Sequence, residues 1–255
     1  SRDEVSQLVQ MSEELDLIIP RGSNELVQSI QARAQVPVLG HADGICHVFI
    51  DAYADSEKAR KVVLDSKTDY PAVCNALETL LVDQDLNPEL LKKIMEDLVQ
   101  AGVEIRAWRD TQKKLEGHSQ LEMGNASEED WKTEHLEMVL SVKTVAGLEE
   151  AIQHINRYGS NHTDSIVTES REAAERFMNE IDSAGVFWNA STRFADGFRY
   201  GLGAEIGVST CKTHARGPVG LEGMVIYKYK LYGSGQGAGS YSKGERKFMH
   251  QPLEI

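Results

Sequence analysis

The sequence contains little cysteine, and its three cysteines lie far apart. Cys46, Cys74 and Cys211 form no CxxC pair among the 255 residues. An odd number of widely spaced cysteines argues against a disulfide framework, so we expect a reducing, intracellular location, either cytoplasmic or mitochondrial. The eight histidines include no HExxH motif and no tight Cys/His cluster. We therefore predict that the chain holds no structural metal.

Long apolar runs and positive charge are also scarce. No run approaches the roughly 18 apolar residues that would suggest a membrane span. The first residues, Ser1 to Glu4, have neither the basic segment nor the apolar core of a signal peptide, and the chain is predicted to begin inside a protein. With 27 Lys and Arg against 40 Asp and Glu, the net charge of −13 argues against a nucleic-acid surface. An anionic substrate stays compatible, because the local field matters more than the total charge.

Apolar strand-like runs alternate with helical patterns along most of the chain. The expected strands are His47–Ile50, Thr79–Val82, Val103–Ala107, Met138–Val142, Ser165–Thr168 and Val186–Trp188. The expected helices are Asn24–Ala34, Asp55–Lys67, one between Asn87 and Gly102, Leu148–Tyr158 and Arg171–Ile181. This alternation predicts an α/β fold with a mainly parallel sheet and helices on its faces. Residues 112–132 are polar and are expected to form an exposed excursion, and Gly233–Ser242 a Gly/Ser-rich loop.

Cys74 lies in a segment that ordinary packing does not explain. Pro71 ends the preceding helix, which places Cys74 in a turn between a helix and a strand. A thiol in such a turn is partly exposed, and neighbouring backbone N–H groups stabilise a thiolate and, later, an oxyanion. The alternative is a small buried hydrophobe, the commoner fate of a free cysteine. That alternative is favoured for Cys46, inside the apolar run Ile45–Ile50, and a core or surface position for Cys211.

Two further segments carry polar groups suited to a ligand. The first places Asn189, Ser191 and Arg193 just after an expected strand, and ligands gather beyond the carboxyl ends of strands. A capped turn is the alternative for Ser191 taken alone. The second, Gly201–Pro218, is rich in glycine and carries Arg216, but it matches neither GxGxxG nor a GKS/GKT phosphate loop. Two arginines in such loops suit the anchoring of a carboxylate or phosphate.

At these residues the chain resembles the glutamyl-phosphate (gamma-glutamyl phosphate) reductases. The stretch Val145–Ile166 is similar to the family signature at Ala151, His154-Ile155-Asn156, Tyr158-Gly159-Ser160 and His162-Thr163-Asp164. Other similar blocks are Lys67-Thr68, Cys74-Asn75, Glu78–Val82, Asn189–Phe194, Gly201–Glu205 and His214–Pro218. Pro37–His47 and Asp69–Pro71 look more like the eukaryotic form, in which the reductase is the C-terminal half of the bifunctional delta-1-pyrroline-5-carboxylate synthase. The resemblance covers nearly the whole chain and is weakest at 110–132 and after 232.

The resemblance implies the fold of the aldehyde dehydrogenases, a three-layer α/β/α catalytic domain with a partial Rossmann-like nucleotide-binding domain. Residues 1–43 would be the remainder of the nucleotide-binding domain and residues 44–220 the catalytic (thiol) domain. Residues 221–255 would be a C-terminal strand and tail that return to the nucleotide-binding and oligomerisation region. A homo-oligomer, a dimer or higher, is implied as well. The eukaryotic form adds a fused or associated glutamate kinase domain as a candidate partner.

The implied reaction is NADPH-dependent reduction of L-glutamyl 5-phosphate to L-glutamate 5-semialdehyde and phosphate, in proline biosynthesis. Cys74 would be the nucleophile and form a thioester, which hydride from NADP(H) reduces. Glu134 resembles the glutamate that binds the nicotinamide ribose, with a solvated helix-start carboxylate as its alternative. The candidates for substrate binding are Asn75, Asn189, Ser191, Arg193 and Arg216.

Two other functions compete with this one. A different thiol aldehyde dehydrogenase would oxidise a free aldehyde, and a carboxylate poised over Cys74 would favour it. A catalytically incomplete, dimerising scaffold is favoured by the absence of the long N-terminal stretch that carries most of the family's cofactor-binding segment. A cofactor titration separates this scaffold from an enzyme.

Overall fold

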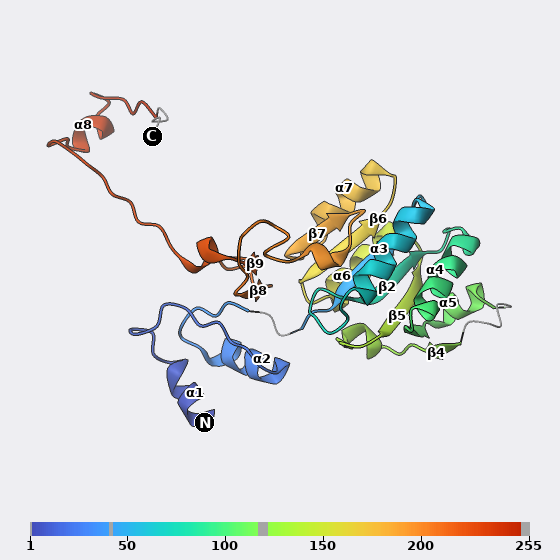
Figure 1. The fold of residues 1–255 in the computed structure, drawn as a ribbon. Coiled ribbons are helices and arrows are strands. Elements are labelled where there is room, and N and C mark those ends of the chain that lie inside the picture. The colour runs from blue at the N-terminus through green and yellow to red at the C-terminus, as the bar shows by residue number, and fades with distance from the viewer. Residues whose placement is uncertain (1, 41–42, 117–121, 251–255) are drawn as a thin grey trace. The chain divides into compact units, whose positions relative to one another are not determined.

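The computed structural model describes residues 2–40, 43–116 and 122–250, and the chain divides into two compact units, Ser1–Met224 and Val225–Ile255. The first unit contains a seven-stranded sheet (Figure 1), and every pair of neighbouring strands is parallel. The strand order is β4 (Met123–Asn125), β3 (Glu104–Ala107), β5 (Val139–Val145), β2 (Leu77–Asp83), β1 (Cys46–Ile50), β6 (Thr163–Val167) and β7 (Gly185–Trp188). The predicted α/β fold with a mainly parallel sheet is confirmed.

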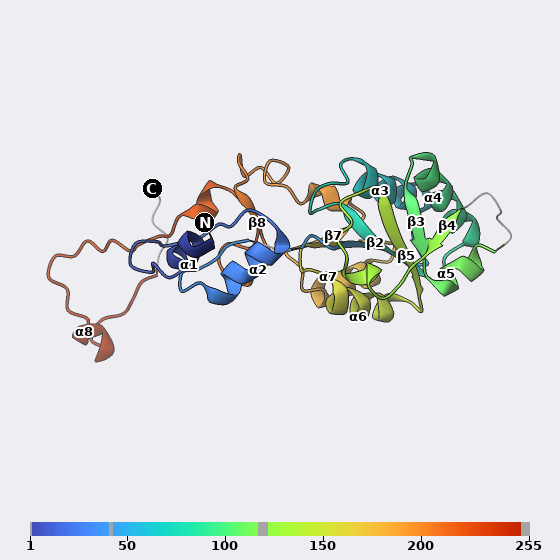
Figure 2. The same cartoon turned by 90° about the horizontal axis from the view of Figure 1, so that it is seen from below.

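Helices cover both faces of this sheet, as Figure 2 shows. On one face α3 (Ser56–Thr68) and α4 (Pro88–Gln100) share an aliphatic core with β1, β2, β3 and β5. On the other, α6 (Leu148–Tyr158) and α7 (Arg171–Glu180) pack through residues such as Ile155 and Phe177. Burying one such large apolar side chain contributes about 1.5–3 kcal/mol. Because both faces are covered, every residue of β1 and β2 is buried, which explains the apolar runs Val48–Ile50 and Leu80–Val82 within them.

The helix ends follow from local sequence. Asp55 caps α3, its carboxylate accepting hydrogen bonds from the backbone N–H groups of Glu57 and Lys58 at 3.1 and 2.9 Å. Asn87 caps α4 in the same way, and Pro88 occupies the first turn, where a missing N–H costs nothing. After α4, Gly102 has a φ of 87°, a left-handed conformation that glycine adopts readily. The predicted limits of this helix are confirmed.

The expected exposed excursion at 112–132 is wrong in part. The segment begins inside α5 (Arg109–Lys114), and residues 117–121 lie outside the described part of the chain. After them, β4 pairs with β3, and the 3₁₀ helix η1 (Asp130–Lys132) buries Trp131 to 1% exposure. The Trp131 ring lies 5.3 Å from that of His154 and 5.6 Å from that of Trp108. The apolar surface of this one large ring outweighs its polar neighbours.

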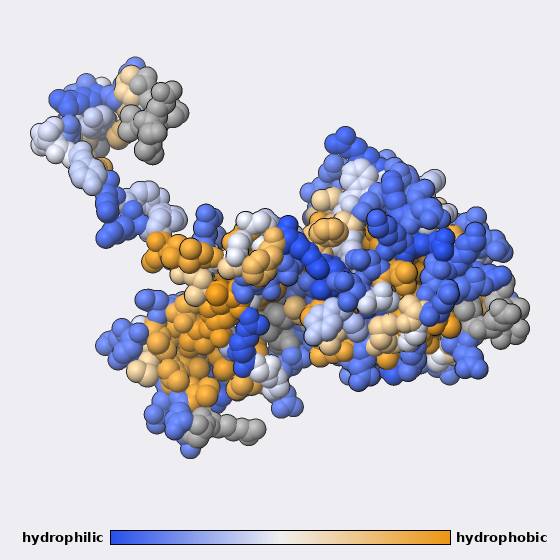
Figure 3. Space-filling view, viewed as in Figure 1, coloured by the Kyte–Doolittle hydropathy of each residue, from blue (hydrophilic) through white to orange (hydrophobic). Residues whose placement is uncertain are grey.

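The first 40 residues and the segment after β7 complete the first unit. The former contain α1 (Arg2–Leu8), α2 (Asn24–Arg33) and a single parallel bridge between Ile18 and Val38. Figure 3 shows apolar side chains gathered on the surface over this region. The segment after β7 contains η2 (Thr192–Phe194), the antiparallel pair β8 (Gly207–Ser209) and β9 (Gly217–Val219), and η3 (Leu221–Met224).

The second unit contains one short helix, α8 (Gly239–Ser242), and no strand among its described residues 225–250. The expected C-terminal strand in 221–255 stays a prediction, as do the expected domain limits. None of the helices in the described part of the chain is both long and apolar enough to cross a membrane.

Candidate active site

Cys74 lies in the wall of a cavity of about 270 Å³. The cavity is lined by Ile19, Pro20, Arg21, Gly22, Asn24, Val27, Leu39, Gly40, Cys74, Glu134, Leu136, Gly207 and Val208. These residues come from the first 40 positions, the turn before β2, the segment before β5, and β8. The structure thus brings together Cys74 and Glu134, two of the residues that the sequence singles out.

Contacts from Cys46 and Gly44 fix the backbone of the Cys74 turn. As predicted, Cys74 follows α3 and precedes β2, and it is half-buried. The Cys46 thiol in β1 donates to the Cys74 carbonyl oxygen at 3.2 Å. A Cβ added to Gly44 would lie 2.4 Å from the Cys74 Cα, so glycine at position 44 is required by this close approach. Cys46 itself is fully buried, which confirms the prediction that it is a core residue.

Opposing influences act on the pKa of Cys74. Burial first, and then the carboxylates of Glu134 and Glu205, raise the pKa of the Cys74 thiol to about 12. The Cys74 backbone N–H and the Arg193 guanidinium act in the opposite direction but do not compensate. The expected effect of the backbone N–H, which favours the thiolate, is therefore present. Burial, together with two carboxylates that are distant in sequence, outweighs it.

A Glu134→Gln variant should test this balance. Removing one carboxylate lowers the pKa of Cys74, so more thiolate is present at pH 9 and alkylation becomes several-fold faster. The rate of iodoacetamide labelling at Cys74, followed by peptide mass spectrometry, measures this. Glu137→Gln, an exposed glutamate in the same segment, is the matched control and should leave the rate unchanged. Equal rates in the two variants would show that Glu134 does not act on the thiol.

Glu134 is an acceptor-only group in the cavity wall. Its carboxylate accepts hydrogen bonds from the Gly44 backbone N–H and from the Asn24 side chain. Burial is the largest influence on Glu134 and raises its pKa, and Asp43 adds to the effect. A half-buried carboxylate beside a thiol can accept hydrogen bonds from the hydroxyl groups of a sugar.

Arg193 is buried and already has protein partners. Its Nε donates to Asp69 Oδ2 at 3.0 Å, and its Nη1 donates to Asn75 Oδ1. The Asn75 side-chain amide in turn donates to the Ala195 carbonyl at 2.9 Å. Arg193 and Asn75 therefore tie the residue next to Cys74 to the end of α3 and to the loop that contains η2. In this structure both side chains position the Cys74 turn.

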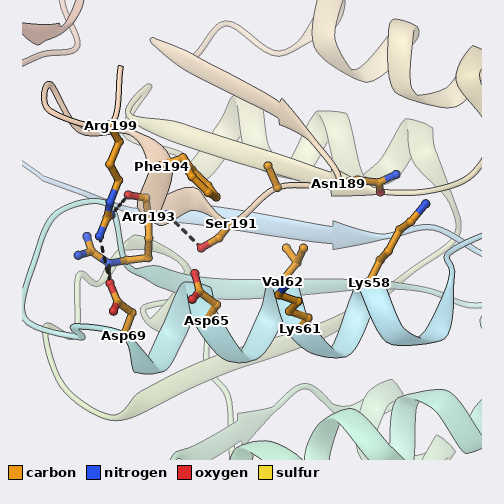
Figure 4. Close-up of a pocket in the computed structure, with 11 residues that line it drawn as sticks. Lys58, Lys61, Val62, Asp65, Asp69, Asn189, Ser191, Arg193, Phe194 and Arg199 are labelled. Carbon is orange, nitrogen blue, oxygen red and sulfur yellow. Dashed lines mark hydrogen bonds and ion pairs between the residues drawn. The ribbon is translucent and has the colours of Figure 1, made fainter. Parts of the chain in front are cut away.

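A second cavity, of about 470 Å³, lies between α3 and the loop after β7 (Figure 4). It is lined by Lys58, Lys61, Val62, Asp65, Asp69, Asn189, Ala190, Ser191, Arg193, Phe194 and Arg199. Figure 4 shows Arg193, Arg199 and Asp69 gathered at one end and Lys58 and Asn189 at the other. Three of the predicted substrate-binding residues thus share one cavity, whose walls carry both signs of charge. The connection to Cys74 runs through Arg193 and Asn75.

Several polar groups of this second cavity have structural partners. Asn189, at a left-handed φ of 54°, exchanges hydrogen bonds with the backbone N–H and C=O of Thr168, both at 3.0 Å. The Ser191 hydroxyl accepts from Ser66 at 3.1 Å and from the Arg193 backbone N–H at 3.3 Å. The capped turn that was the alternative for Ser191 is therefore present.

Arg216 lies apart from both sets of lining residues. Its guanidinium donates to the carboxylate and to the backbone carbonyl of Asp182, at 3.0 and 2.8 Å. Lys212 also pairs with Asp182. The structure therefore does not bring Arg216 to the other candidates, and its substrate-binding role stays a prediction. Among the described residues, no group of three or more His, Cys, Asp or Glu side chains could hold a metal ion.

No protein-family model matches the chain. Sequence comparison finds similarity to the gamma-glutamyl phosphate reductase of Acetivibrio thermocellus, 53% identical over 99% of this chain and 57% of the relative. A probable gamma-glutamyl phosphate reductase of Schizosaccharomyces pombe is 51% identical over all of this chain and 57% of its own length. The chain thus spans a little over half the length of these curated relatives.

Solved structures give the same picture of the fold. The gamma-glutamyl phosphate reductase of Thermotoga maritima superposes with a TM-score of 0.87 at 42% identity, over 92% of this chain and 56% of that one. A propionaldehyde dehydrogenase from Clostridium phytofermentans gives a TM-score of 0.61 at 15% identity, over 86% of this chain and 57% of that one. At that identity the likeness concerns the fold alone. The predicted aldehyde-dehydrogenase-like fold is confirmed.

Proposed function

We propose that this chain is the thiol-bearing part of a gamma-glutamyl phosphate reductase, an oxidoreductase that reduces L-glutamyl 5-phosphate to L-glutamate 5-semialdehyde in proline biosynthesis. The observation that carries the proposal is the meeting of Cys74 and Glu134 in one cavity. Identities of 51–53% over nearly the whole chain support it. The similar proteins include bacterial and fungal reductases, so the resemblance to the reductase half of delta-1-pyrroline-5-carboxylate synthase, with its kinase partner, is a narrower proposal.

The first chemical step belongs to Cys74. Its thiol loses a proton to water, and the sulfur attacks the acyl carbon of the acyl phosphate. A C–S bond forms, and the bond between the acyl carbon and the bridging phosphate oxygen breaks. Phosphate leaves with the electron pair of that bond. Because phosphate is a good leaving group, no strong general acid is required. The raised pKa of Cys74 means that only a small fraction of the thiol is ionised near neutral pH.

The cavity around Cys74 fits one end of NADP(H). A volume of about 270 Å³ suits a nicotinamide with its ribose and is too small for a whole dinucleotide. Glu134 would accept hydrogen bonds from the ribose hydroxyls, and Gly40 and Gly207 leave room at the wall. When bound, the nicotinamide supplies a hydride to the thioester carbonyl. The remainder of the cofactor would need a segment that the longer relatives add, and the apolar surface over the first 40 residues offers a place for it to pack.

The second cavity is the proposed site for the glutamyl part of the substrate. Arg193 and Arg199 lie at the end nearest the Cys74 turn, where they suit a carboxylate or phosphate. Asn189 and Ser191 would add hydrogen bonds from the loop after β7, and Asn75 connects this cavity with Cys74. Arg216 would contribute only if its guanidinium released the Asp182 carboxylate and bound the substrate in its place.

The proposal predicts an acyl adduct on one cysteine. The chain is mixed with L-glutamyl 5-phosphate that a separate glutamate kinase supplies continuously, and the products are mapped by peptide mass spectrometry. We expect one glutamyl adduct, on Cys74, which hydroxylamine removes as it does a thioester. A reaction without ATP, in which no acyl phosphate forms, is the control. An unmodified Cys74, or equal modification of Cys46 and Cys211, would contradict the proposal.

Oxidation of a free aldehyde is a second candidate, because two carboxylates act on Cys74. Glu134 and Glu205 both raise its pKa, and a nearby carboxylate is what a thioester-hydrolysing enzyme needs to activate water. Both groups are already engaged, however. Glu205 accepts from the Gly197 backbone N–H at 2.8 Å, and Glu134 from Gly44 and Asn24. A thioester that persists in water would favour the reductase, and rapid hydrolysis the oxidation.

Oligomerisation is proposed through the C-terminal unit. Its residues Val225–Tyr232 are rich in β-branched and aromatic side chains, and Ile226, Tyr229 and Leu231 are almost fully exposed. Such a segment suits pairing as a strand with a second copy of the chain. The incomplete, dimerising scaffold would keep this property without turnover, so the adduct experiment separates the two.

A further inference from the structure

A fully buried ion pair joins Lys67 to Glu78. The Lys67 Nζ lies 3.0 Å from Glu78 Oε2, and both side chains have 0% exposure. Removing two charges from water is costly, and replacing such a pair by apolar residues is often neutral or stabilising. A buried ion pair is therefore poor evidence of a contribution to stability. Its position in the fold suggests a different purpose.

The pair closes the turn that carries the nucleophile. Lys67 lies in the last turn of α3, and Glu78 is the second residue of β2. Residues 69–76 form the connection between α3 and β2, and this connection includes Cys74. The ion pair thus fixes the separation of the two ends of this turn.

The same glutamate also contacts a second segment of the Cys74 cavity wall. Glu78 Oε1 accepts a hydrogen bond from the Leu136 backbone N–H at 3.3 Å. Leu136 follows Glu134 by two residues, and both line the cavity with Cys74. One buried carboxylate therefore contacts α3 through Lys67 and the Glu134 segment through Leu136.

Leu136 shows that this contact restrains the backbone. Its φ of 55° is left-handed, which costs a residue other than glycine about 1 kcal/mol or more. Such a conformation persists where surrounding contacts fix it, and the hydrogen bond to Glu78 is one of them. Burial raises the pKa of Glu78 to about 7 although Lys67 opposes the shift, so the pair occupies a strongly dehydrated position.

We infer that Lys67 and Glu78 are positioning residues that hold the Cys74 turn and the Glu134 segment in register across the cavity. Neither side chain lines the cavity, so both act through the residues they hold. The catalytic use of this register rests on the proposed function, but the register itself can be measured without substrate or cofactor.

The test is the reactivity of each cysteine in a Lys67→Met/Glu78→Leu variant. We expect iodoacetamide to label Cys74 about tenfold faster, because a loosened turn exposes the thiol and its pKa returns toward that of a free cysteine. Cys211, whose thiol contacts Gln31 and Gly40, should keep its rate within about twofold, and the urea midpoint should not fall. In contrast, acyl-adduct formation on Cys74 should slow, because the thiol is no longer oriented. Faster alkylation with slower acylation is a combination that a purely structural pair would not give.

The matched control is Arg60→Met/Asp97→Leu. This pair also begins on α3, joining it to α4 with an Nε–Oδ2 distance of 2.7 Å, but it touches neither wall of the cavity. It should leave the Cys74 alkylation rate unchanged.

An unchanged Cys74 rate in the folded double variant would overturn the inference, and so would equal acceleration of Cys74 and Cys211. If the double variant does not fold, Glu78→Gln keeps the side-chain shape and the acceptor for Leu136 while removing the charge. It should still accelerate Cys74 selectively, and an unchanged rate there would be equally decisive. Because alkylation needs no substrate, failure of the reductase proposal alone would leave this result intact.

Discussion

A Cys74→Ser variant should form the acyl adduct at least about 1,000-fold more slowly than the parent chain, with little change in folding stability. Among the described residues that line its cavity, no other has a nucleophilic hydroxyl, thiol or amine. A serine oxygen is far less ionised than a thiol, and the nearby carboxylates of Glu134 and Glu205 already accept hydrogen bonds from other groups. Rapid mixing with the acyl phosphate, followed by intact-mass measurement, gives the rate.

Cys211→Ser is the matched control for this substitution. Cys211 is also half-buried, and its thiol lies 3.9 Å from the Gly40 carbonyl, near the same part of the chain. The control should acylate at the parent rate. If both variants slow equally, the effect arises from a general loss of packing. If neither slows, the acyl group is carried elsewhere, and the assignment of Cys74 fails.

The central sheet could be predicted because its physical requirements are visible in short windows of sequence. Strands covered on both faces need apolar side chains on both sides, and the runs Leu80–Val82 and Val48–Ile50 provide them. Capping groups such as Asn87 mark helix ends locally. The prediction of an exposed excursion at 112–132 was wrong in part for the opposite reason. Trp131 is buried by His154 and Trp108, which lie 23 residues away on either side of it, and no local window contains both partners.

The same distinction separates what could and could not be predicted of the site. Pro71 and the following strand place Cys74 in a turn, but its pKa depends on Glu205 and Glu134, which only the fold brings near. Arg216 pairs with Asp182, a contact across 34 residues that no local window shows, and its predicted anion-binding role stays a prediction. The buried pair of Lys67 and Glu78 is visible in the sequence as one charge on the apolar side of a helix and another inside a buried strand.

The turn between α3 and β2 contributes lining residues to both cavities. Asp69, at its start, lines the larger cavity, and Cys74 lines the smaller one. Arg193 donates hydrogen bonds to both Asp69 and Asn75. A ligand that displaces either partner would therefore change the hydrogen bonding of the residue next to Cys74. This arrangement offers a way for a ligand in the larger cavity to change the pKa of Cys74, because Arg193 is also one of the groups that lower that pKa.

Gly44→Ala should be the most damaging single-methyl change near this turn. The added Cβ would lie 2.3 Å from the Cys74 carbonyl oxygen and 2.4 Å from its Cα, and backbone atoms cannot move aside as a flexible side chain can. Overpacking of this kind costs about 1–3 kcal/mol, and more where the backbone is the obstacle. We expect a lower urea midpoint and loss of acyl-adduct formation, since relief of the clash displaces Cys74.

Gly40→Ala gives this prediction its control. A Cβ at Gly40 would meet only Pro20 side-chain atoms at 3.6 Å, an ordinary contact, although Gly40 lines the same cavity. Its urea midpoint should stay close to that of the parent. The comparison distinguishes two causes of damage, because a filled cavity would affect both variants and a displaced turn only Gly44→Ala. If Gly44→Ala retained full stability and acylation, the close approach of residue 44 to the nucleophile would not be a requirement of the site.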